Sequence, residues 1–168
     1  MADAISNTSP LLYLHRIGAM EWLSQLFHEV WVPTAVVAEL KEGQRRGHDV
    51  PVPSNYGWVK IMEPKLMPSE WLSLDLGNGE LAAMALALEN PVHVVLLDDA
   101  LARRTAEAAG LSVQGTLRIL LDAKSRGLTE RVEPWVDKLE GAGMWVSAGV
   151  RQRILSLAGE GGASGGPR

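Results

Sequence analysis

Short apolar runs alternate along this chain with longer segments in which apolar residues recur at helical spacing. The run at residues 92–97 is the strongest strand signal, because strands buried in a parallel sheet read as continuous apolar stretches. Shorter runs of the same character lie at residues 4–6, 30–32, 58–62 and 111–113. This alternation predicts an α/β fold with a mainly parallel sheet of about four to five strands.

Helices are predicted between these runs and after the last of them. The first begins at Thr8, Ser9 and Pro10, which are typical of a helix start, and ends at Gly18. Further helices are expected at residues 22–27, 34–40, 81–88, 99–109 and 116–126, and two C-terminal helices between residues 132 and 157. Residues 43–48 are expected to form a loop, and the strand at 58–62 to lie at a sheet edge.

Length and charge limit the class of protein. The 168 residues, 46% hydrophobic and 21% charged, fit a single domain, expected over residues 1–158, followed by a flexible glycine-rich tail at 159–168. A net charge of −4 argues against binding nucleic acid through bulk positive charge, and the absence of cysteine excludes disulfides and thiolate zinc sites. No apolar run is long enough to span a bilayer and no signal peptide is evident, so a cytoplasmic protein is expected.

Familiar catalytic and nucleotide-binding motifs are absent from the sequence. It contains no GxxxxGK[ST] loop, no GxGxxG after a strand and no HExxH pair. The four histidines share no metal-ligand spacing, and His93, inside an apolar run, is expected to be a core or edge residue. The carboxylates are therefore the main source of candidate chemistry.

Asp98 and Asp99 directly follow the strongest strand. Asp99 is explained as the cap of the next helix. Asp98 would lie at the carboxyl end of a central strand, where open α/β sheets bind their ligands. The alternative is that both residues serve only to cap the helix.

Three further polar residues stand out, each with a structural alternative. Glu39 lies in a segment with apolar neighbours nearly all round, which predicts a largely buried helix where an ionised carboxylate is costly; the alternative is a surface stripe. Glu80 opens an apolar helix, where the helix dipole alone would favour it. Asn7 follows the first strand and offers a carbonyl ligand, or is an ordinary turn residue.

The predicted topology brings these residues together. Parallel strands joined by right-handed crossovers place their carboxyl ends at one edge of the sheet. The residues expected there are Asn7, Glu39, Glu80, Asp98 and Asp99. Carboxylates packed so closely repel one another unless a cation is present, and oxygen ligands without histidine or cysteine favour Mg²⁺ or Mn²⁺. Such an ion suits hydrolysis of a phosphodiester bond.

Four spaced motifs in this order resemble a PIN-domain ribonuclease. They are SNTSPL at 6–11, VVAEL at 36–40, LGNGELA at 76–82 and LLDD at 96–99 with ARR at 102–104, followed by LSVQGT at 111–116. The resemblance covers residues 2–126, the core motifs. It is strongest to a branch usually described as predicted nucleic-acid-binding proteins, which is related to VapC-type toxins.

The resemblance implies a three-layer α/β/α fold and Mg²⁺- or Mn²⁺-dependent cleavage of single-stranded RNA. It implies Glu39, Glu80 and Asp98 as the acidic set, with Asp99 as a further ligand or only a cap. Asn7 stands where the general PIN pattern has an aspartate, and losing that charge weakens the attraction for a cation.

Substrate and partners are also implied. Thr8 is expected to support the water or metal shell. Arg103 and Arg104, beside the acidic pair, are expected to contact phosphates, or else to be solvated surface. The implied partners are single-stranded RNA, an antitoxin protein and a second copy in a homodimer. A non-catalytic or weakly active PIN scaffold that binds RNA or a protein is the alternative function.

Overall fold

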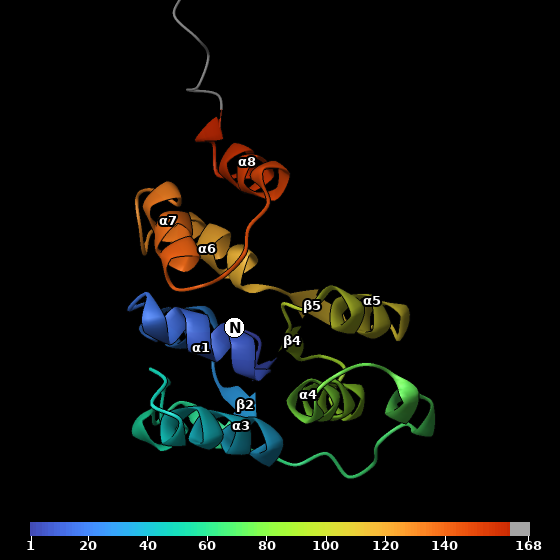
Figure 1. Cartoon of the computed structure of the whole chain (residues 1–168). Helices are drawn as coiled ribbons and strands as arrows, with labels where there is room; N and C mark the ends of the chain where they lie inside the picture. Colours follow the sequence, from blue (N-terminus) through green and yellow to red (C-terminus); the bar gives the residue numbers. More distant parts are fainter. Residues whose placement is uncertain (162–168) are drawn as a thin grey trace, which may run out of the picture. The chain divides into compact units, whose positions relative to one another are not determined.

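The computed structural model describes residues 1–161. The chain divides into two compact units, Met1–Thr116 and a second that begins at Leu117 (Figure 1). The single domain predicted over residues 1–158 spans both units and stays a prediction.

A five-stranded sheet forms the centre of the first unit. Its strands are β1 (Ala4–Ser6), β2 (Val30–Val32), β3 (Val59–Ile61), β4 (Val94–Leu96) and β5 (Ser112–Gln114). All pair in parallel, in the order β3-β2-β1-β4-β5. Ala4 of β1 lies opposite both Val30 and Val94, so the three central strands begin in register. The predicted parallel sheet and the edge position of β3 are confirmed.

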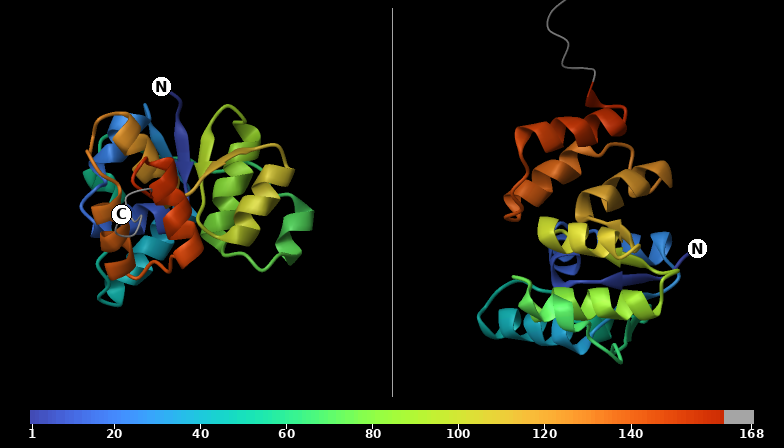
Figure 2. Two further views of the ribbon diagram at one scale, coloured as in Figure 1. Left: turned by 90° about the horizontal axis from the view of Figure 1, so that it is seen from above. Right: turned by 90° about the vertical axis from the view of Figure 1, so that its right-hand side faces the viewer.

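Helices cover both faces of this sheet. Those of the first unit are α1 (Thr8–Arg16), α2 (Glu21–Leu26), α3 (Thr34–Arg45), α4 (Asn78–Glu89) and α5 (Ala100–Ala108), with short 3-10 helices η1 (Pro53–Asn55) and η2 (Ser69–Ser73). Figure 1 shows α1 on one face, and α4 and α5 on the other; Figure 2 shows α4 and α5 side by side. Helix α3 packs against both α1 and α4. The expected three-layer α/β/α arrangement is confirmed.

Some predicted boundaries were wrong. Strand β4 begins at Val94 rather than 92, because Val92 is exposed after Pro91 and β1 offers only three residues for pairing. Helix α3 continues through Gly43 to Arg45, where a loop was predicted. Glu42 binds Arg45 and Arg46 in this last turn, and such pairs at helical spacing offset the cost of one glycine.

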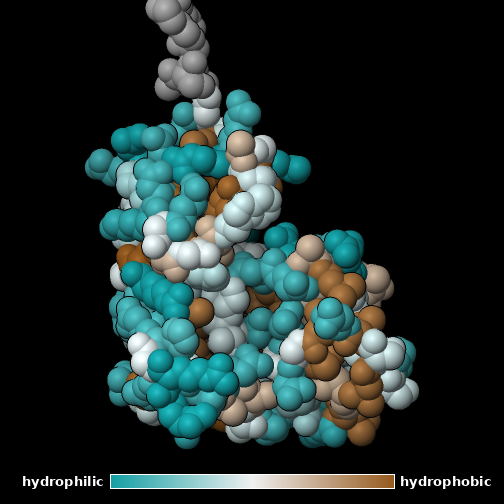
Figure 3. Space-filling view, in the orientation of Figure 1, coloured by the Kyte–Doolittle hydropathy of each residue, from teal (hydrophilic) through white to brown (hydrophobic). Residues whose placement is uncertain are grey.

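Helix α4 accounts for much of the core. Seven consecutive residues, from Leu81 to Ala87, are buried, which explains the unbroken apolar sequence. The helix begins at Asn78, three residues before the predicted start, because Gly77 serves as its N-cap. Figure 3 shows hydrophobic side chains gathered on the side of this unit that carries α4 and α5. Exposed large hydrophobic residues of this unit include Leu66 and Leu72.

The second unit contains the rest of α6 (Thr116–Ser125), then α7 (Glu133–Gly141) and α8 (Ala148–Leu157). Glu160 accepts hydrogen bonds from the backbone N–H groups of Val132 and Glu133 and from Lys124 Nζ. The flexible tail predicted from Gly159 is therefore wrong at its start, because Glu160 is held by three donors. Residues 162–168 of that predicted tail lie outside the described residues. No helix within residues 1–161 has both the length and the apolar character needed to cross a bilayer.

Candidate functional site

The carboxyl edge of the sheet carries the residues that the sequence singled out. Asn7 directly follows β1, and its N–H donates to the carbonyl of Leu96, the last residue of the neighbouring strand β4. Asp98 and Asp99 follow two and three residues after Leu96. Adjacent parallel strands thus deliver Asn7 and the aspartate pair to one place.

The first turn of α1 connects two sides of this edge. The hydroxyl of Thr8 donates a short hydrogen bond to Oε2 of Glu39, on α3. The hydroxyl of the next residue, Ser9, donates to Oδ2 of Asp98 over 2.7 Å. Two successive side chains therefore fix carboxylates that are far apart in sequence.

Asp98 is the most completely bonded of the predicted ligands. Besides Ser9, Thr116 donates to it twice, from its N–H to Oδ1 and from its hydroxyl to Oδ2, each over 2.8 Å. Gly115 permits this approach, since a Cβ there would lie 3.2 Å from Oδ1 of Asp98 and 3.1 Å from Nη1 of Arg103. Asp98 thus positions the start of α6, and Arg103 reaches the same glycine.

Glu39 is held from two directions. Its Oε2 accepts from Thr8, and its Oε1 accepts from the N–H of Gly79 over 2.8 Å. A Cβ on Gly79 would lie 2.7–2.9 Å from the atoms of this carboxylate, so the carboxylate could keep its position only beside a glycine. The prediction of a largely buried helix around Glu39 was wrong: α3 buries only Val36 and Leu40, on the face that packs inward, and Glu39 is exposed.

Glu80 has the least favourable electrostatic environment of the predicted carboxylate ligands. Burial raises its pKa, the N–H of Gly77 counteracts this weakly over 3.4 Å, and the negative charges of Asp99 and Glu39 raise the pKa further. Its other oxygen, Oε2, is buried and has no hydrogen-bond partner. Glu80 therefore lies within electrostatic reach of two other carboxylates, and only its Oε1 has a donor, the N–H of Gly77.

Asp99 caps α5, as predicted. Its Oδ2 accepts a hydrogen bond of 2.9 Å from the N–H of Ala102. Its charge nevertheless contributes to the field at Glu80. Capping and a role at the site are thus compatible for this residue.

Asn7 does not behave as an ordinary capping residue. It occupies the N-cap of α1, yet its side chain makes no capping hydrogen bond. The residue is 5% exposed, and its Oδ1 is buried without a partner. A buried carbonyl oxygen left unpaired is costly, and a bound cation or water would satisfy it.

The donor set fits a hard divalent cation. Asn7 Oδ1 and Glu80 Oε2 are buried oxygens that lack partners, and Glu39 and Asp99 add negative charge nearby. Oxygen donors of this kind are those preferred by Mg²⁺ and Mn²⁺. Asp98 fits less directly, because its oxygens already accept three hydrogen bonds. Within residues 1–161, the ligand atoms of Glu39, Glu80 and Asp98 do not all lie within 4.8 Å of one another, whereas those of another group, described below, do.

The predicted phosphate contacts lie next to these groups. Arg103 and Arg104 are both exposed on α5, immediately after the Asp99 cap. Nη1 of Arg103 lies close to Gly115. At the other side of the site, a hollow of about 390 Å³ is lined by Ala35, Ala38, Glu39, Glu42, Arg46 and Asn78.

The chain matches the family model DUF3368, described as a PIN domain, over residues 3–160. It belongs to the PIN-domain family. A PIN domain is a nuclease-type fold, and PIN domains are generally hydrolases that use divalent metals. No curated protein matches this chain, and no solved structure matches it either.

A second polar group of this PIN domain was missed from the sequence. Ligand atoms of Asp3, His28 and Glu29 all lie within 4.8 Å of one another. His93 approaches the same aspartate, with Nε2 3.5 Å from Asp3 Oδ2. Sequence spacing did not reveal the group, but position did carry a signal: Asp3, Glu29 and His93 each directly precede a strand.

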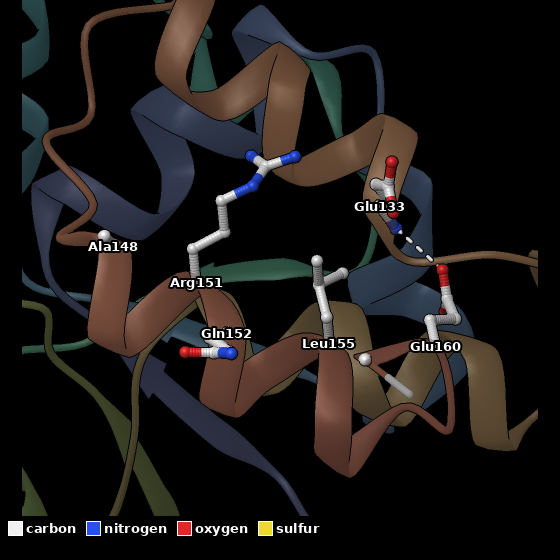
Figure 4. A pocket seen from close by; sticks show the side chains of 7 residues that line it. Glu133, Ala148, Arg151, Gln152, Leu155 and Glu160 are labelled. Atoms are coloured by element: carbon white, nitrogen blue, oxygen red, sulfur yellow. Dashed lines mark hydrogen bonds between the residues drawn. The ribbon is translucent and has the colours of Figure 1, made fainter. Parts of the chain in front are cut away.

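The second unit has a hollow of its own, of about 430 Å³, that carries no comparable chemistry. Figure 4 shows Arg151 and Leu155 of α8 beside it, and the hydrogen bond from the N–H of Glu133 to Glu160. Arg151 is already paired with Asp137 and Glu140 of α7. These groups join the helices and leave no free acid or base pair among the lining residues.

Proposed function

We propose that this PIN domain is a Mg²⁺- or Mn²⁺-dependent endoribonuclease that hydrolyses phosphodiester bonds of single-stranded RNA. One observation carries the proposal: Asn7 Oδ1 and Glu80 Oε2 are buried at the carboxyl edge of the sheet and have no partner. Two unsatisfied oxygens beside the charges of Glu39 and Asp99 are poorly stabilised by the protein alone. A divalent cation would stabilise all of them.

The protein's own side chains have distinct parts in this proposal. Asn7, Glu80 and Asp99 would hold the ion, with Glu39 and Asp98 fixed around it by Thr8, Ser9 and Thr116. The bound ion supplies a more acidic water and neutralises charge that develops on the cleaved phosphate.

The substrate is proposed from the charges around the site. Arg103 and Arg104 offer exposed guanidinium groups next to Asp99, which suits contacts to successive phosphates. Such contacts position a strand without reading its bases. The hollow beside Glu39, with Arg46 and Asn78 in its lining, offers room for a neighbouring nucleotide. An antitoxin protein and a second copy in a homodimer remain the proposed protein partners.

The test is cleavage of a labelled single-stranded RNA with Mn²⁺ or Mg²⁺. We expect cleavage that stops on chelation and resumes when the ion is restored. Glu80→Gln and Asp98→Asn should each lower the rate by at least a hundredfold, because each removes a charge from the site. Asp98→Asn keeps its structural contacts, since the hydroxyls of Ser9 and Thr116 can turn to accept from the new amide.

Glu107→Gln is the matched control. Glu107 is an exposed carboxylate near the end of α5 remote from the Asp99 cap, and its loss should leave the rate unchanged. Cleavage that persists in both site variants, or in the presence of chelator, would rule out the proposed chemistry.

A binding scaffold without nuclease activity is the second candidate. The three hydrogen bonds that saturate much of Asp98, and the neutral amide at Asn7, favour it. This alternative predicts RNA binding in the absence of divalent ions. Calorimetric titration with Mn²⁺ separates the two candidates, because only the nuclease requires an ion to bind at Glu80.

A further inference from the structure

The amino edge of the sheet carries a row of polar residues remote from the proposed nuclease site. Asp3, Glu29 and His93 directly precede β1, β2 and β4. Because Ala4 lies opposite Val30 and Val94, the three preceding residues are also neighbours, with Asp3 in the middle. The carboxyl-edge residues lie at the other end of the same strands.

Asp3 is the hub of this row. Its Oδ1 accepts from the N–H of Glu29 over 3.0 Å and lies 3.2 Å from Nδ1 of His28. One carboxylate oxygen of Asp3, one of Glu29 and one ring nitrogen of His28 all lie within 4.8 Å of one another. Oε2 of Glu29 also lies 3.9 Å from Nζ of Lys60.

His93 adds an independent observation. It is 8% exposed, and neither of its ring nitrogens has a hydrogen-bond partner. Its ring lies against Trp31, with 4.3 Å between ring centroids, and its Nε2 points to Asp3 Oδ2 from 3.5 Å. The buried imidazole of His93 therefore lies near Asp3 without forming a hydrogen bond to it, and its hydrogen-bonding capacity is unused in the protein alone.

We propose that Asp3, His28 and Glu29 form a binding site for a divalent transition-metal ion, with Zn²⁺ as the ion it fits best. Two carboxylates and an imidazole are a donor set that favours Zn²⁺ over Mg²⁺, unlike the oxygen donors at the opposite edge. His93 is a positioning residue: its Nε2–H would hold the outer oxygen of Asp3, as a carboxylate ligand to a metal usually requires. The bound ion would join the starts of β1 and β2.

The test uses the full chain without an affinity tag, titrated with Zn²⁺ by calorimetry and with Co²⁺ by visible absorption. We expect one Zn²⁺ ion per chain at this site and Co²⁺ bands that report nitrogen and oxygen ligands. His28→Ala and Asp3→Asn should each weaken Zn²⁺ binding at least tenfold. Neither change threatens folding, since His28 is exposed and an asparagine at position 3 can still accept from the N–H of Glu29.

His15→Ala is the matched control. His15 Nε2 lies 2.8 Å from Asp49 Oδ1, which makes an ordinary histidine–aspartate pair without a third ligand, so its removal should leave Zn²⁺ affinity unchanged. His93→Gln should weaken binding while the Co²⁺ spectrum keeps its form, because His93 is not itself a ligand.

Unchanged affinity in His28→Ala and Asp3→Asn would overturn the proposed site. So would Zn²⁺ binding that is lost in Glu80→Gln and retained in His28→Ala, because the ion would then belong to the carboxyl edge. RNA cleavage is read out separately from either result, so the nuclease proposal stands or falls by its own test.

Discussion

Ser9 donates a 2.7 Å hydrogen bond to Asp98, a residue 89 positions later in the chain. Its neighbour Thr8 binds Glu39 on α3. The first turn of α1 therefore holds the carboxylates of Glu39 and Asp98 in place. Asn7, whose Oδ1 has no partner, directly precedes this turn. Polar residues that look like helix-start chemistry in the sequence are instead used to position acids.

Ser9→Ala tests the hydrogen bond from α1 to Asp98. Removing the hydroxyl deprives Asp98 of one of three donors, and we expect a loss of about 1 kcal/mol in the free energy of unfolding. RNA cleavage should fall by only roughly tenfold, because Asp98 keeps both hydrogen bonds from Thr116 and stays near its position. Urea unfolding and cleavage rates measure the two effects. An unchanged rate would mean that the Ser9 contact is structural only.

Gly79→Ala should inactivate the protein more than any other conservative change at the start of α4. The new Cβ would lie 2.7–2.9 Å from the carboxylate of Glu39, so that carboxylate must move and the bond from the Gly79 N–H is lost. We expect a loss of at least a hundredfold in cleavage.

Gly77→Ala, two residues earlier, is the matched control for Gly79→Ala. A Cβ at Gly77 meets Glu80 Oε1 at 3.4 Å and Glu39 Oε1 at 3.8 Å, which is ordinary contact. Its backbone, with φ −70° and ψ 160°, suits any residue. Equal losses in the two variants would show that the crowding at Glu39 is not what matters.

Asn7→Asp should tighten Mn²⁺ binding. The substitution keeps the shape of the side chain and gives the buried Oδ1 a negative charge, which attracts the cation more strongly. We expect the dissociation constant to fall at least tenfold by calorimetry and the cleavage rate to rise. Without the ion, a further carboxylate beside Glu80 should lower the melting temperature. Asn7→Ser, which adds no charge, is the control and should not tighten binding.

The fold was predictable because its signals are local. Continuous apolar runs, a proline after β2 and the Asp99 cap each mark an element through its own residues. The wrong boundaries occur where tertiary contacts decide at which residue an element begins or ends. Strand β4 is as short as its pairing with β1 permits, and the glycine-rich start of the predicted tail is held because Glu160 meets two backbone N–H groups 27 and 28 residues away.

The positions of Asn7 and Asp98 in the fold were predictable, but the hydrogen bonds around the candidate site were not. Position after a parallel strand places Asn7 and Asp98, which topology alone dictates. Hydrogen bonding of Asp98 by Thr116, and the exposure of Glu39, depend on how the helices meet, and no periodicity reports this. The amino-edge group was missed for the same reason, since His28 and His93 become neighbours of Asp3 only through strand register.

Glu80→Gln should stabilise the metal-free protein at neutral pH. Burial and the charges of Asp99 and Glu39 raise the pKa of Glu80, so its ionisation costs stability in the fold. The variant avoids this cost, and solvent screening keeps the gain small, at about 1–3 °C in melting temperature. The gain should appear above the raised pKa of Glu80 and vanish below the pKa of the unfolded chain. Mn²⁺ should raise the melting temperature of the unmodified protein more than that of the variant.

Glu160→Gln should destabilise the second unit. Burial alone would raise the pKa of Glu160, but hydrogen bonds from Val132, Lys124 and Glu133 outweigh this and lower it. Donors to an ionised carboxylate contribute about 2 kcal/mol, so we expect a loss of that order in the free energy of unfolding at neutral pH.

The acid limb of the stability curve gives the decisive measurement for Glu160. A lowered pKa means that its contribution is present above the unfolded value and disappears as pH falls through the folded one. Urea midpoints of the unmodified protein and Glu160→Gln should therefore converge as the pH falls to the folded pKa. Glu140→Gln, which removes an exposed partner of Arg151, should cost well under about 1 kcal/mol at any pH. Parallel curves for the unmodified protein and Glu160→Gln down to the lowest pH would contradict the assignment, because the difference would then not depend on the charge of Glu160.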